Sequence, residues 1–413
     1  MNAAPGELRG RVQRPVYLDY QATSPCDPRV LTAMLPFFTE EFGNPHSVGH
    51  DYGRSAFDAI ELARIDVAAL IGAKPYEIVF TSGATEADNL ALKGALTAPR
   101  RRGDHIVTVA TEHRAVLDVC RRLEAGGTAV TYLPVSHIGQ IDLGQLEAAI
   151  RPDTTLVSVM AANNEVGVVQ PLKEIGAICR RQGALFHTDA AQAAGKITLD
   201  VESMNIDLLS ISGHKLYGPK GIGALYVRSR PRARIACQMD GGGQERGLRA
   251  GTLPTPLCVG LGEACRISLV EQDDEAGRLS VLRDYLLNGL RAAIPEMRVN
   301  GDLEHRLPGN LSVSFLGIAT SALLADLRLI AVSSGSACSS GDAASSHVLE
   351  ALGADTASWA SLRLGLGRFT TRDDIDRAIA DIARAVARLR ELSPLWDMHQ
   401  DGVDLGSYHW AAF

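Results

Sequence analysis

Short runs rich in β-branched and aliphatic residues alternate with longer stretches of helical periodicity between Tyr17 and about Gly260. This alternation is typical of βαβ units around a largely parallel sheet. The strands that it predicts are Glu77 to Phe80, His105 to Ala110, Leu156 to Ala161, Ala184 to Thr188, Asp207 to Ser212 and Gly223 to Val227. Polar or glycine-rich sequence ends each run, so the pattern indicates an α/β fold with a mostly parallel, doubly wound sheet.

Helices should cover that sheet, and the stretch from Arg54 to Leu70 is the clearest example. Its apolar residues recur at helical spacing, which predicts one buried stripe made of Phe57, Ile60, Ala63, Val67 and Leu70.

The pattern changes after the glycine-rich segment Gly241 to Thr252, where a long helical region leads to strands near Leu311 to Phe315 and Leu329 to Ser333. A chain of 413 residues suggests about two domains. We therefore expect a large domain over residues 17–262 and a smaller α+β domain over residues 263–413, together with residues 1–16. The stretch from Ser333 to Ser346, rich in Ser, Gly and Ala, should be mobile.

The composition fits an ordinary soluble globular protein, with 46% hydrophobic and 22% charged residues. A formal net charge of −7 lacks the basic excess that binds a phosphate backbone, so we expect no direct nucleic-acid partner. No apolar stretch is long enough to span a bilayer, and the first residues lack the apolar core of a secretory signal. A cytoplasmic protein without membrane association is the expectation, and an Arg-rich organellar presequence is the alternative for the first residues.

The seven cysteines form neither an even set nor a CxxC ladder, so neither a disulfide framework nor a metal cluster is predicted. Most of them, such as Cys120 and Cys179, lie in apolar helical settings typical of core residues. Cys338 differs because serines, alanines and glycines surround it, where a thiol can stay exposed and act as a nucleophile. An adventitious loop thiol is the other interpretation.

Ligands of open α/β sheets bind beyond the carboxyl ends of the strands, so polar residues that follow strands are the first candidates for a site. Lys215 lies in a polar turn after Asp207 to Ser212, and Asp189 ends the preceding strand, which places both at one edge of the sheet. This pair suits pyridoxal phosphate, which needs an imine-forming lysine and a carboxylate that keeps its pyridine nitrogen protonated. Taken singly, Lys215 also fits a surface loop, and Asp189 also fits a helix N-cap.

A phosphate cradle is predicted at Thr81 to Thr85, because this turn precedes a helix and amides at a helix N-terminus bind anions. Thr85 followed by Asp88 also fits a simple helix cap. Further donors would come from Ser212, His214 and, from a neighbouring subunit, Thr252.

Four more side chains have the chemistry of a cofactor or substrate site. His113 follows a predicted strand, so its imidazole could lie over a bound ring and exchange protons. Asn164 and Gln192 could donate to a phenolic oxygen or to a substrate carboxylate. Arg363 could clamp a carboxylate through two hydrogen bonds. The structural alternatives are a helix-capping histidine, turn amides and an internal salt bridge.

Several motifs together resemble the cysteine desulfurases in order and approximate spacing: YLDYQAT, FGNPHS, TSGATEADN, EHRAVLD, NNEVG, SGHKLYGPKG, GGGQERGLRAGT, SSGSACSS and GRFTT. The resemblance runs from about Tyr17 to the C-terminus, and the segment around Cys338 is similar to the class with a long mobile cysteine loop. It implies a fold-type I aminotransferase-like architecture, a homodimer and pyridoxal 5'-phosphate as cofactor. The extension before Tyr17 departs from the pattern.

The resemblance also implies a role for each candidate. Lys215 would bind the cofactor, Asp189 would pair with its ring nitrogen, and His113 would stack on its ring. The phosphate would be held by Ala84, Thr85, Ser212, His214 and the other subunit's Thr252. Asn164 and Gln192 would contact cofactor or substrate, Arg363 would bind the substrate carboxylate, and Cys338 would accept the sulfur.

The implied activity is conversion of L-cysteine to L-alanine, with the sulfur passed to Cys338 as a persulfide for iron-sulfur cluster assembly and tRNA thiolation. Lys215 would remove the α-proton, and His113 would give or take a proton. No resident metal is expected, although Cys338 could transiently ligate a nascent iron-sulfur cluster. The aromatic-rich tail from Ser393 to Phe413 resembles that of the housekeeping enzymes, whose C-terminus docks an iron-sulfur scaffold protein. Other sulfur acceptors stay open, and packing of the tail on its own domain is the other interpretation.

Two other functions fit parts of the sequence. Selenocysteine lyase, or another enzyme with the aminotransferase fold, would share the cofactor residues, and formation of alanine and persulfide from cysteine would separate it from a desulfurase. A docking protein with secondary catalysis would explain the aromatic tail.

Overall fold

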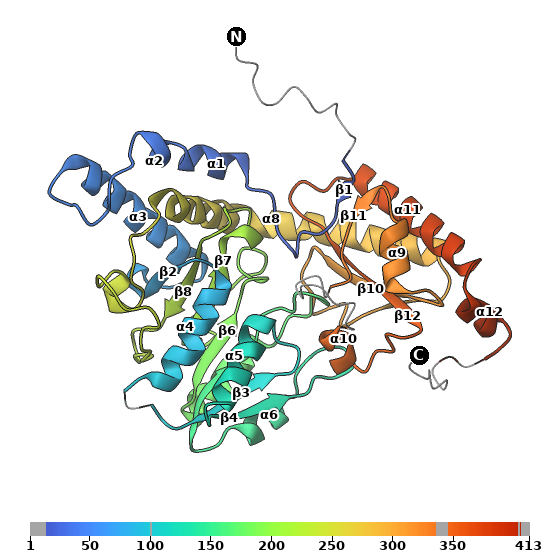
Figure 1. Ribbon diagram of the computed structural model, residues 1–413, viewed down its shortest axis with the longest axis horizontal. Coiled ribbons are helices and arrows are strands. Elements are labelled where there is room, and N and C mark those ends of the chain that lie inside the picture. The colour runs from blue at the N-terminus through green and yellow to red at the C-terminus, as the bar shows by residue number, and fades with distance from the viewer. Residues whose placement is uncertain (1–13, 100, 336–345, 404, 406–413) are drawn as a thin grey trace, which may run out of the picture.

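The structure is a computed structural model that describes residues 14–99, 101–335, 346–403 and 405. In these residues the strands form a seven-stranded sheet, a three-stranded sheet and a two-stranded pair, with helices around them (Figure 1). The strands are β1 (Val16–Tyr17), β2 (Ile78–Thr81), β3 (His105–Val109), β4 (Ala129–Leu133), β5 (Thr154–Ser158), β6 (Leu185–Asp189), β7 (Leu208–Ser212), β8 (Gly223–Val227), β9 (Met297–Val299), β10 (Asn310–Leu316), β11 (Ile330–Ala331) and β12 (Trp359–Gly365).

The helices alternate with these strands through the first half of the chain and are longer in the second half. The α-helices are α1 (Pro28–Met34), α2 (Pro36–Thr39), α3 (Asp51–Leu70), α4 (Ala84–Thr97), α5 (Arg114–Glu124), α6 (Leu143–Ala149), α7 (Leu172–Gln182), α8 (Thr255–Ala293), α9 (Thr320–Asp326), α10 (His347–Ala351), α11 (Arg372–Arg390) and α12 (Pro394–Gln400). Short 3-10 turns are η1 (Pro75–Glu77), η2 (Gly213–Lys215) and η3 (Glu245–Gly247).

The seven-stranded sheet has the order β2-β8-β7-β6-β5-β3-β4 in the described part of the chain. The strands from β7 to β4 run parallel, and only β8 runs antiparallel to both of its neighbours. The mostly parallel α/β sheet predicted from the sequence is therefore confirmed. Strand β4 was not predicted, because it lies at the sheet edge, where its residues are largely half-buried and their hydrophobic signal is weak.

Apolar residues on alternate positions of these strands pack into two different cores, one on each face. On β3, for example, Ile106 packs with α4 and α5, whereas Val107 packs with α7 and α3. Both faces of the sheet are thus covered, and polar side chains of the sheet reach open space only where strands end.

Helix α3 shows where the sequence pattern was ambiguous. Ile60, Ala63, Val67 and Leu70 are buried, as predicted, but the Phe57 side chain is 44% exposed, so its predicted place in the stripe is wrong. Residues three or four positions before Ile60, Phe57 or Ala56, can both face the core in a helix. The fold buries Ala56 and leaves Phe57 exposed.

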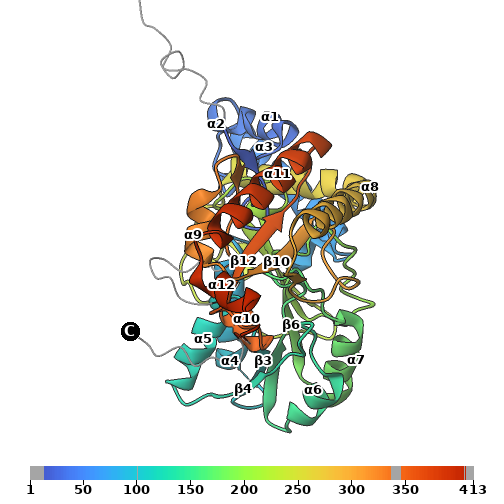
Figure 2. The same ribbon diagram turned by 90° about the vertical axis from the view of Figure 1, so that its right-hand side faces the viewer.

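The three-stranded antiparallel sheet has the order β12-β10-β9, and α11 lies across one of its faces (Figure 2). Leu18 packs in this smaller core, and β1 pairs with β11, so residues 16–18 lie with the small sheet rather than with the large one. The expected boundary between residues 262 and 263 falls inside α8. The first part of this helix packs in the large core and its last part packs in the small one, so α8 is shared between the two domains that we propose.

Candidate functional site

A cavity of about 620 Å³ lies at the carboxyl ends of the large sheet and against β12 of the small sheet. Its walls contain nearly all the side chains that the sequence predicted for a site: Ala84, Thr85, His113, Asn164, Asp189, Gln192, Ser212, His214, Lys215 and Arg363. The exceptions are Thr252, which is exposed and lies outside this cavity, and Cys338, which lies outside the described residues.

Lys215 enters the cavity from η2, the tight turn after β7. Its Nζ donates to the backbone carbonyls of Gln21 and Ala22, the latter at 2.9 Å. The amine is therefore fixed by backbone that crosses over from the N-terminal segment, and a surface-loop setting for Lys215 is wrong.

Asp189 is the last residue of β6, and its Oδ1 accepts a hydrogen bond of 2.8 Å from the Ala191 amide. Burial, followed by the neighbouring carboxylate of Asp88, raises the pKa of the Asp189 carboxyl to about 6. A cationic ring nitrogen placed against this carboxyl would favour its charged form, because opposite charges stabilise each other in a buried setting.

The turn between β2 and α4 leaves open space in front of the helix N-terminus. The N-cap is Gly83, at φ 153°, and the helix begins at Ala84, so Thr85 lies in the first turn and is not the cap. A Cβ built on Gly83 would have no atom within 4 Å. The first amides of a helix have no partner within that helix, and here they border the cavity, which suits an anion.

Two histidines of the cavity are held by their ring nitrogens. His113 is the N-cap of α5, and its Nδ1 accepts from the Ala115 amide at 3.1 Å, so the predicted cap and a place in the site occur together. His214 Nδ1 lies 3.0 Å from the Thr23 hydroxyl. Burial, together with the nearby lysines, lowers the pKa of His214 to about 4, so its imidazole is neutral at neutral pH.

Arg363 is only 1% exposed, and its guanidinium donates to the Asp19 carboxylate at 2.8 Å and to the Asn164 carbonyl at 3.0 Å. The internal salt bridge considered from the sequence is therefore present. The buried Arg363 Nε has no hydrogen-bond partner among the described residues. One donor is left over, which is unusual in a protein interior unless a ligand takes it.

The described residues that flank the stretch with Cys338 both lie next to the buried Glu165, which is the neighbour of Asn164 in the sequence. A Cβ on Gly335 would lie 2.8 Å from Glu165 Oε2, and the Ser346 hydroxyl donates to the same oxygen at 2.5 Å. Gly335 and Ser346, the described residues on either side of positions 336–345, therefore both lie next to Glu165.

Sequence reasoning missed four participants in this region. Gln21 supplies a backbone carbonyl to Lys215. Burial, followed by the charge of Asp189, raises the pKa of the Glu112 carboxyl, and the buried Asp88 carboxylate raises the pKa of both Glu112 and Asp189. Lys196 donates to Gln192 at 3.3 Å. Their motifs were visible, but a carbonyl carries no residue-type signal, and pairing of distant side chains appears only in the fold.

The residues present fit pyridoxal phosphate, the cofactor that the resemblance implies. An amine and a buried carboxyl face one cavity, a helix N-terminus with an open glycine borders it, and neutral His214 can donate to a phosphate. Amine, carboxyl and anion cradle are the three groups that this cofactor requires of a protein.

Three comparisons with known proteins agree with this geometry. The family model for class-V aminotransferases matches residues 16–378. The chain is 55% identical over 402 residues to cysteine desulfurase IscS from Neisseria meningitidis, covering 97% of this chain and 99% of that one. It is 53% identical over 400 residues to a probable mitochondrial cysteine desulfurase from Dictyostelium discoideum, covering 97% and 89% of the two chains. A solved structure of a NifS-like protein is similar at a TM-score of 0.84 with 38% identity, covering 91% of this chain and all of that one.

Proposed function

The chain belongs to the class-V aminotransferases and, within them, to the pyridoxal-phosphate-dependent cysteine desulfurases, and we propose that it converts L-cysteine to L-alanine by passing the sulfur to Cys338. The observation that carries the assignment of the site is the convergence of Lys215, Asp189 and Arg363 on one cavity. A lysine, a buried carboxyl and a buried arginine suit a cofactor aldehyde, a ring nitrogen and a substrate carboxylate respectively.

Pyridoxal phosphate supplies an electron sink when it is bound. Lys215 would hold the cofactor covalently and would move the proton at the substrate Cα. Asp189 would hold the proton of the ring nitrogen, and His113, fixed by its helix, would move a second proton near the ring. Ala84, Thr85, Ser212 and His214 hold the phosphate, and Asn164 and Gln192 orient cofactor or substrate.

Arg363 binds the substrate carboxylate. Its guanidinium is already oriented by Asp19 and by the Asn164 carbonyl, and the leftover Nε donor provides a contact for the substrate. A preoriented arginine loses little side-chain entropy when the substrate binds.

Cys338 accepts the sulfur. Its thiolate bonds to the substrate Sγ, the Cβ–Sγ bond breaks, and the bonding electron pair leaves with the carbon fragment, which becomes alanine after protonation. Support comes from the position of Gly335, which lies next to Glu165 and so close to the cavity residue Asn164. Cys338 follows three residues later, and three residues span at most about 11 Å, so the chain length keeps Cys338 near the site.

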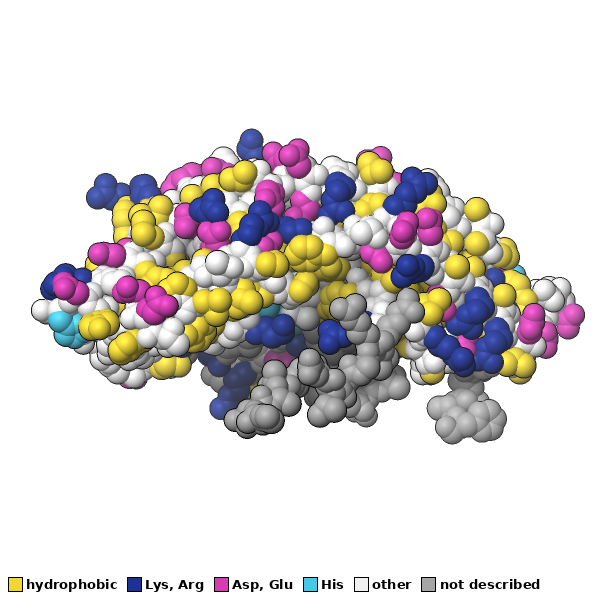
Figure 3. Space-filling view, turned by 90° about the horizontal axis from the view of Figure 1, so that it is seen from above, with side chains coloured by type: hydrophobic (Ala, Val, Ile, Leu, Met, Phe, Trp, Pro, Cys, Tyr) yellow, Lys and Arg dark blue, Asp and Glu magenta, His cyan; other side chains and the backbone are white. Residues whose placement is uncertain are grey.

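A homodimer would bring Thr252 of a second copy to the phosphate. Support comes from apolar side chains that are exposed on and near α1 to α3, where Figure 3 shows wide hydrophobic areas: Leu31, Leu35, Phe38, Phe42, Tyr52, Phe57 and Leu62. A concentration of large exposed apolar side chains in neighbouring elements is typical of a protein interface.

Iron-sulfur cluster assembly is the use that we propose for the sulfur, with tRNA thiolation as a further one. The tail from Ser407 to Phe413, which we propose docks a scaffold protein, lies outside the described residues. Deleting Ser407 to Phe413 should leave alanine formation unchanged and weaken sulfur transfer to a scaffold. Loss of both activities would mean that the tail is needed for the fold.

A cytoplasmic location remains a proposal, since the relative from Dictyostelium is named as mitochondrial. In the part of the chain that the structure describes, no helix combines the length and the apolar character needed to cross a membrane.

The test of this function compares Lys215→Ala and Cys338→Ser for cofactor absorbance, alanine formation and protein-bound persulfide. Lys215→Ala should lose the absorbance of the covalently held cofactor, whereas Cys338→Ser should keep it and bind cysteine but form no enzyme persulfide. Cys237→Ser, at another cysteine outside the core, is the matched control and should behave as the parent. Persulfide on the Cys338→Ser protein would contradict the assignment.

A further inference from the structure

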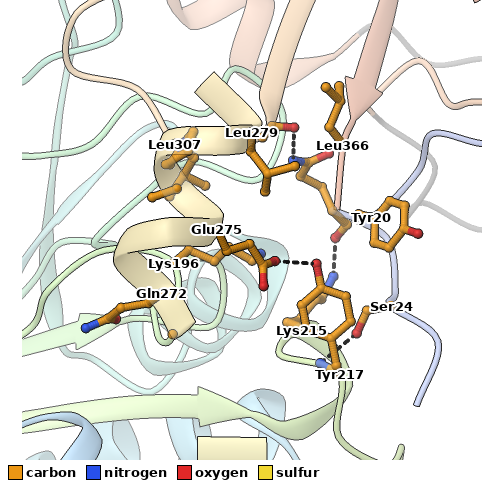
Figure 4. Close-up of a pocket in the computed structure, with 15 residues that line it drawn as sticks. Tyr20, Ser24, Lys196, Lys215, Tyr217, Gln272, Glu275, Leu279, Leu307 and Leu366 are labelled. Carbon is orange, nitrogen blue, oxygen red and sulfur yellow. Dashed lines mark hydrogen bonds between the residues drawn. The ribbon is translucent and has the colours of Figure 1, made fainter. Parts of the chain in front are cut away.

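Tyr217 joins the turn that holds Lys215 to the segment that follows β12. It is buried and lies two residues after Lys215, where η2 ends. Its Oη donates to Glu275 Oε1 of α8 at 2.9 Å (Figure 4). The backbone amide of Arg368, in the segment after β12, donates to the same Oη at 2.6 Å. One phenol therefore contacts both α8 and the small sheet's exit segment from a turn of the large sheet.

The backbone of Tyr217 is in the left-handed region, at φ 63°, which is a rare and costly conformation for a residue with a large side chain. Its neighbours hold it there. The Tyr217 amide donates to Ser24 Oγ at 2.8 Å, and the Tyr217 carbonyl accepts from the Asp27 amide at 2.9 Å. The Ser24 hydroxyl also donates to the His214 carbonyl at 2.9 Å. Strained positions of this kind cluster where a side chain has to be aimed, here toward α8 and Arg368.

Arg368 leads from this contact to the strand that carries Arg363. Its guanidinium carbon lies 4.2 Å from the centre of the Tyr217 ring, and its Nε donates to Glu275 Oε2 at 2.8 Å. Its Nη1 donates to the Asp27 carboxylate at 2.8 Å. Arg363 lies five positions earlier, within β12. The side chain that we propose for the substrate carboxylate is therefore close in the chain to the residue that Tyr217 holds.

The chain between these two arginines is tightly packed. The Gly365 amide donates to the Leu18 carbonyl at 2.7 Å. A Cβ on Gly367 would overlap the Tyr20 ring, so this backbone lies directly against an aromatic side chain. A shift at one arginine would therefore be passed on to the other, because the chain between them has little room to absorb it.

We propose that the Tyr217 phenol sets the position of Arg363 relative to Lys215, and so favours amine substrates that carry a carboxylate. The substrate amine binds where Lys215 holds the cofactor aldehyde, and the substrate carboxylate binds Arg363, so one small molecule has to reach both. This rests on the proposed function, because only a substrate with both groups needs that spacing. Tyr217 is a positioning residue, since it does not line the large cavity.

Tyr217→Phe removes both hydrogen bonds and leaves the ring in place. The segment after β12 should stay attached to α8, because Arg278 of that helix donates to the carbonyls of Gly367 and Thr370. The variant should therefore fold. What it loses is the hydrogen-bonded link between that segment and the turn of the large sheet.

The test compares two amines on the holoenzyme in the Cys338→Ser background, where cysteine should bind without forming a persulfide. L-Cysteine carries the carboxylate and cysteamine lacks it, and the change in visible cofactor absorbance measures equilibrium binding of each. Tyr217→Phe should weaken L-cysteine binding by about fivefold and leave cysteamine binding unchanged. Tyr285→Phe is the matched control, because it removes a phenol of α8 that donates to Asp376 at 2.7 Å, and it should change neither.

A double-variant cycle asks whether Tyr217 acts through Arg363. Arg363→Met alone should weaken L-cysteine binding and leave cysteamine binding unchanged. When Arg363→Met is present, Tyr217→Phe should weaken L-cysteine binding no further, because no guanidinium is left to position.

Equal L-cysteine binding by Tyr217→Phe and the parent would overturn the proposal. Equal weakening of both amines, which indicates a disturbed Lys215 turn, would also overturn it, as would a full Tyr217→Phe effect in the Arg363→Met background. If Tyr217→Phe does not fold, Glu275→Gln carries the same prediction, because it removes the charge that the phenol and Arg368 both contact. Failure of the proposed function gives a different result, because Arg363→Met would then leave L-cysteine binding unchanged.

Discussion

The two sheets contribute to the site in different ways. The seven-stranded sheet supplies residues from strand ends and from the turns that follow, such as Asp189 and Lys215. The three-stranded sheet supplies Arg363 from the middle of β12, opposite Ser312 of β10. The large sheet is covered on both faces, so its polar groups meet a ligand only where strands end.

The small sheet has one apolar and one polar face. Leu362 and Leu364 pack under α11, while Ser361 and Arg363 point the other way, and Ser361 Oγ lies 2.8 Å from Ser314 Oγ. Alternation along β12 therefore places an arginine toward the large domain. A strand can build a site from its middle when one of its faces is left polar.

The largest effect should come from the strand-end carboxyl. Asp189→Asn removes the carboxyl that we propose keeps a proton on the ring nitrogen, and kcat/KM should fall by about a thousandfold. The cofactor should still attach to Lys215, which its absorbance would report. Asp153→Asn, an exposed carboxylate, is the control. A fall in kcat/KM of less than tenfold would contradict a catalytic role for the carboxyl at the end of β6.

Arg363→Met tests the strand-middle contribution. Loss of a charge-assisted carboxylate contact should raise KM for cysteine by about a hundredfold and change kcat much less, as steady-state kinetics would show. Arg298→Met, which changes an arginine of β9 in the same sheet, should leave KM unchanged. A fall in kcat alone would assign Arg363 a role in the chemical step instead.

Gly223→Ala tests how tightly the large sheet packs against the turn between β2 and α4, which we propose holds the phosphate. A Cβ there would lie 2.3 Å from the Ile211 carbonyl oxygen and 2.7 Å from Gly83 Cα, so backbone must move. The free energy of unfolding should fall by about 2 kcal/mol in urea titrations. Gly277→Ala in α8 has open space around it and should be neutral or slightly stabilising. Equal stability of the two variants would mean that the turn is not packed as described.

The smallest effects should come from two threonines that lie outside both sheets, Thr252 and Thr85. Thr252→Ala and Thr85→Ala each remove one hydroxyl, and each should weaken cofactor binding by about threefold to tenfold, as equilibrium titration of the cofactor-free protein would show. The Thr252 effect should vanish in a variant held as a monomer, whereas the Thr85 effect should persist. Persistence of both would contradict a phosphate contact from a second copy.

Much of the fold followed from local pattern. The predicted strands of the large sheet lie within a few residues of the observed ones, because buried strands carry a strong apolar signal. Prediction was weaker where packing against distant residues chooses between alternatives. Either Phe57 or Ala56 could face the core. Helix α8 continues through the expected domain boundary because its residues pack in both cores.

The candidate site was predictable for residues such as Lys215 and Asp189, whose side chains have the required chemistry and which lie where parallel strands end. His113 shows the limit, because the sequence offered a helix cap or a site residue as alternatives, whereas in the structure the residue that caps α5 also lines the cavity. Lys196 shows a second limit, since a lysine in a polar turn has no signal until Gln192 and Gln21 connect it to Lys215.

The sequence by itself determined the large sheet apart from its edge strand β4, its strand-end residues and the set of side chains that suits pyridoxal phosphate, because periodicity and residue type are local properties. Only the tertiary structure decided that Asp19 orients Arg363, that Gln21 holds Lys215 and that Gly335 and Ser346 both lie next to Glu165. Each of these pairs, Glu165 and Gly335 included, joins residues more than a hundred positions apart, and their distances depend on how the two cores pack around α8.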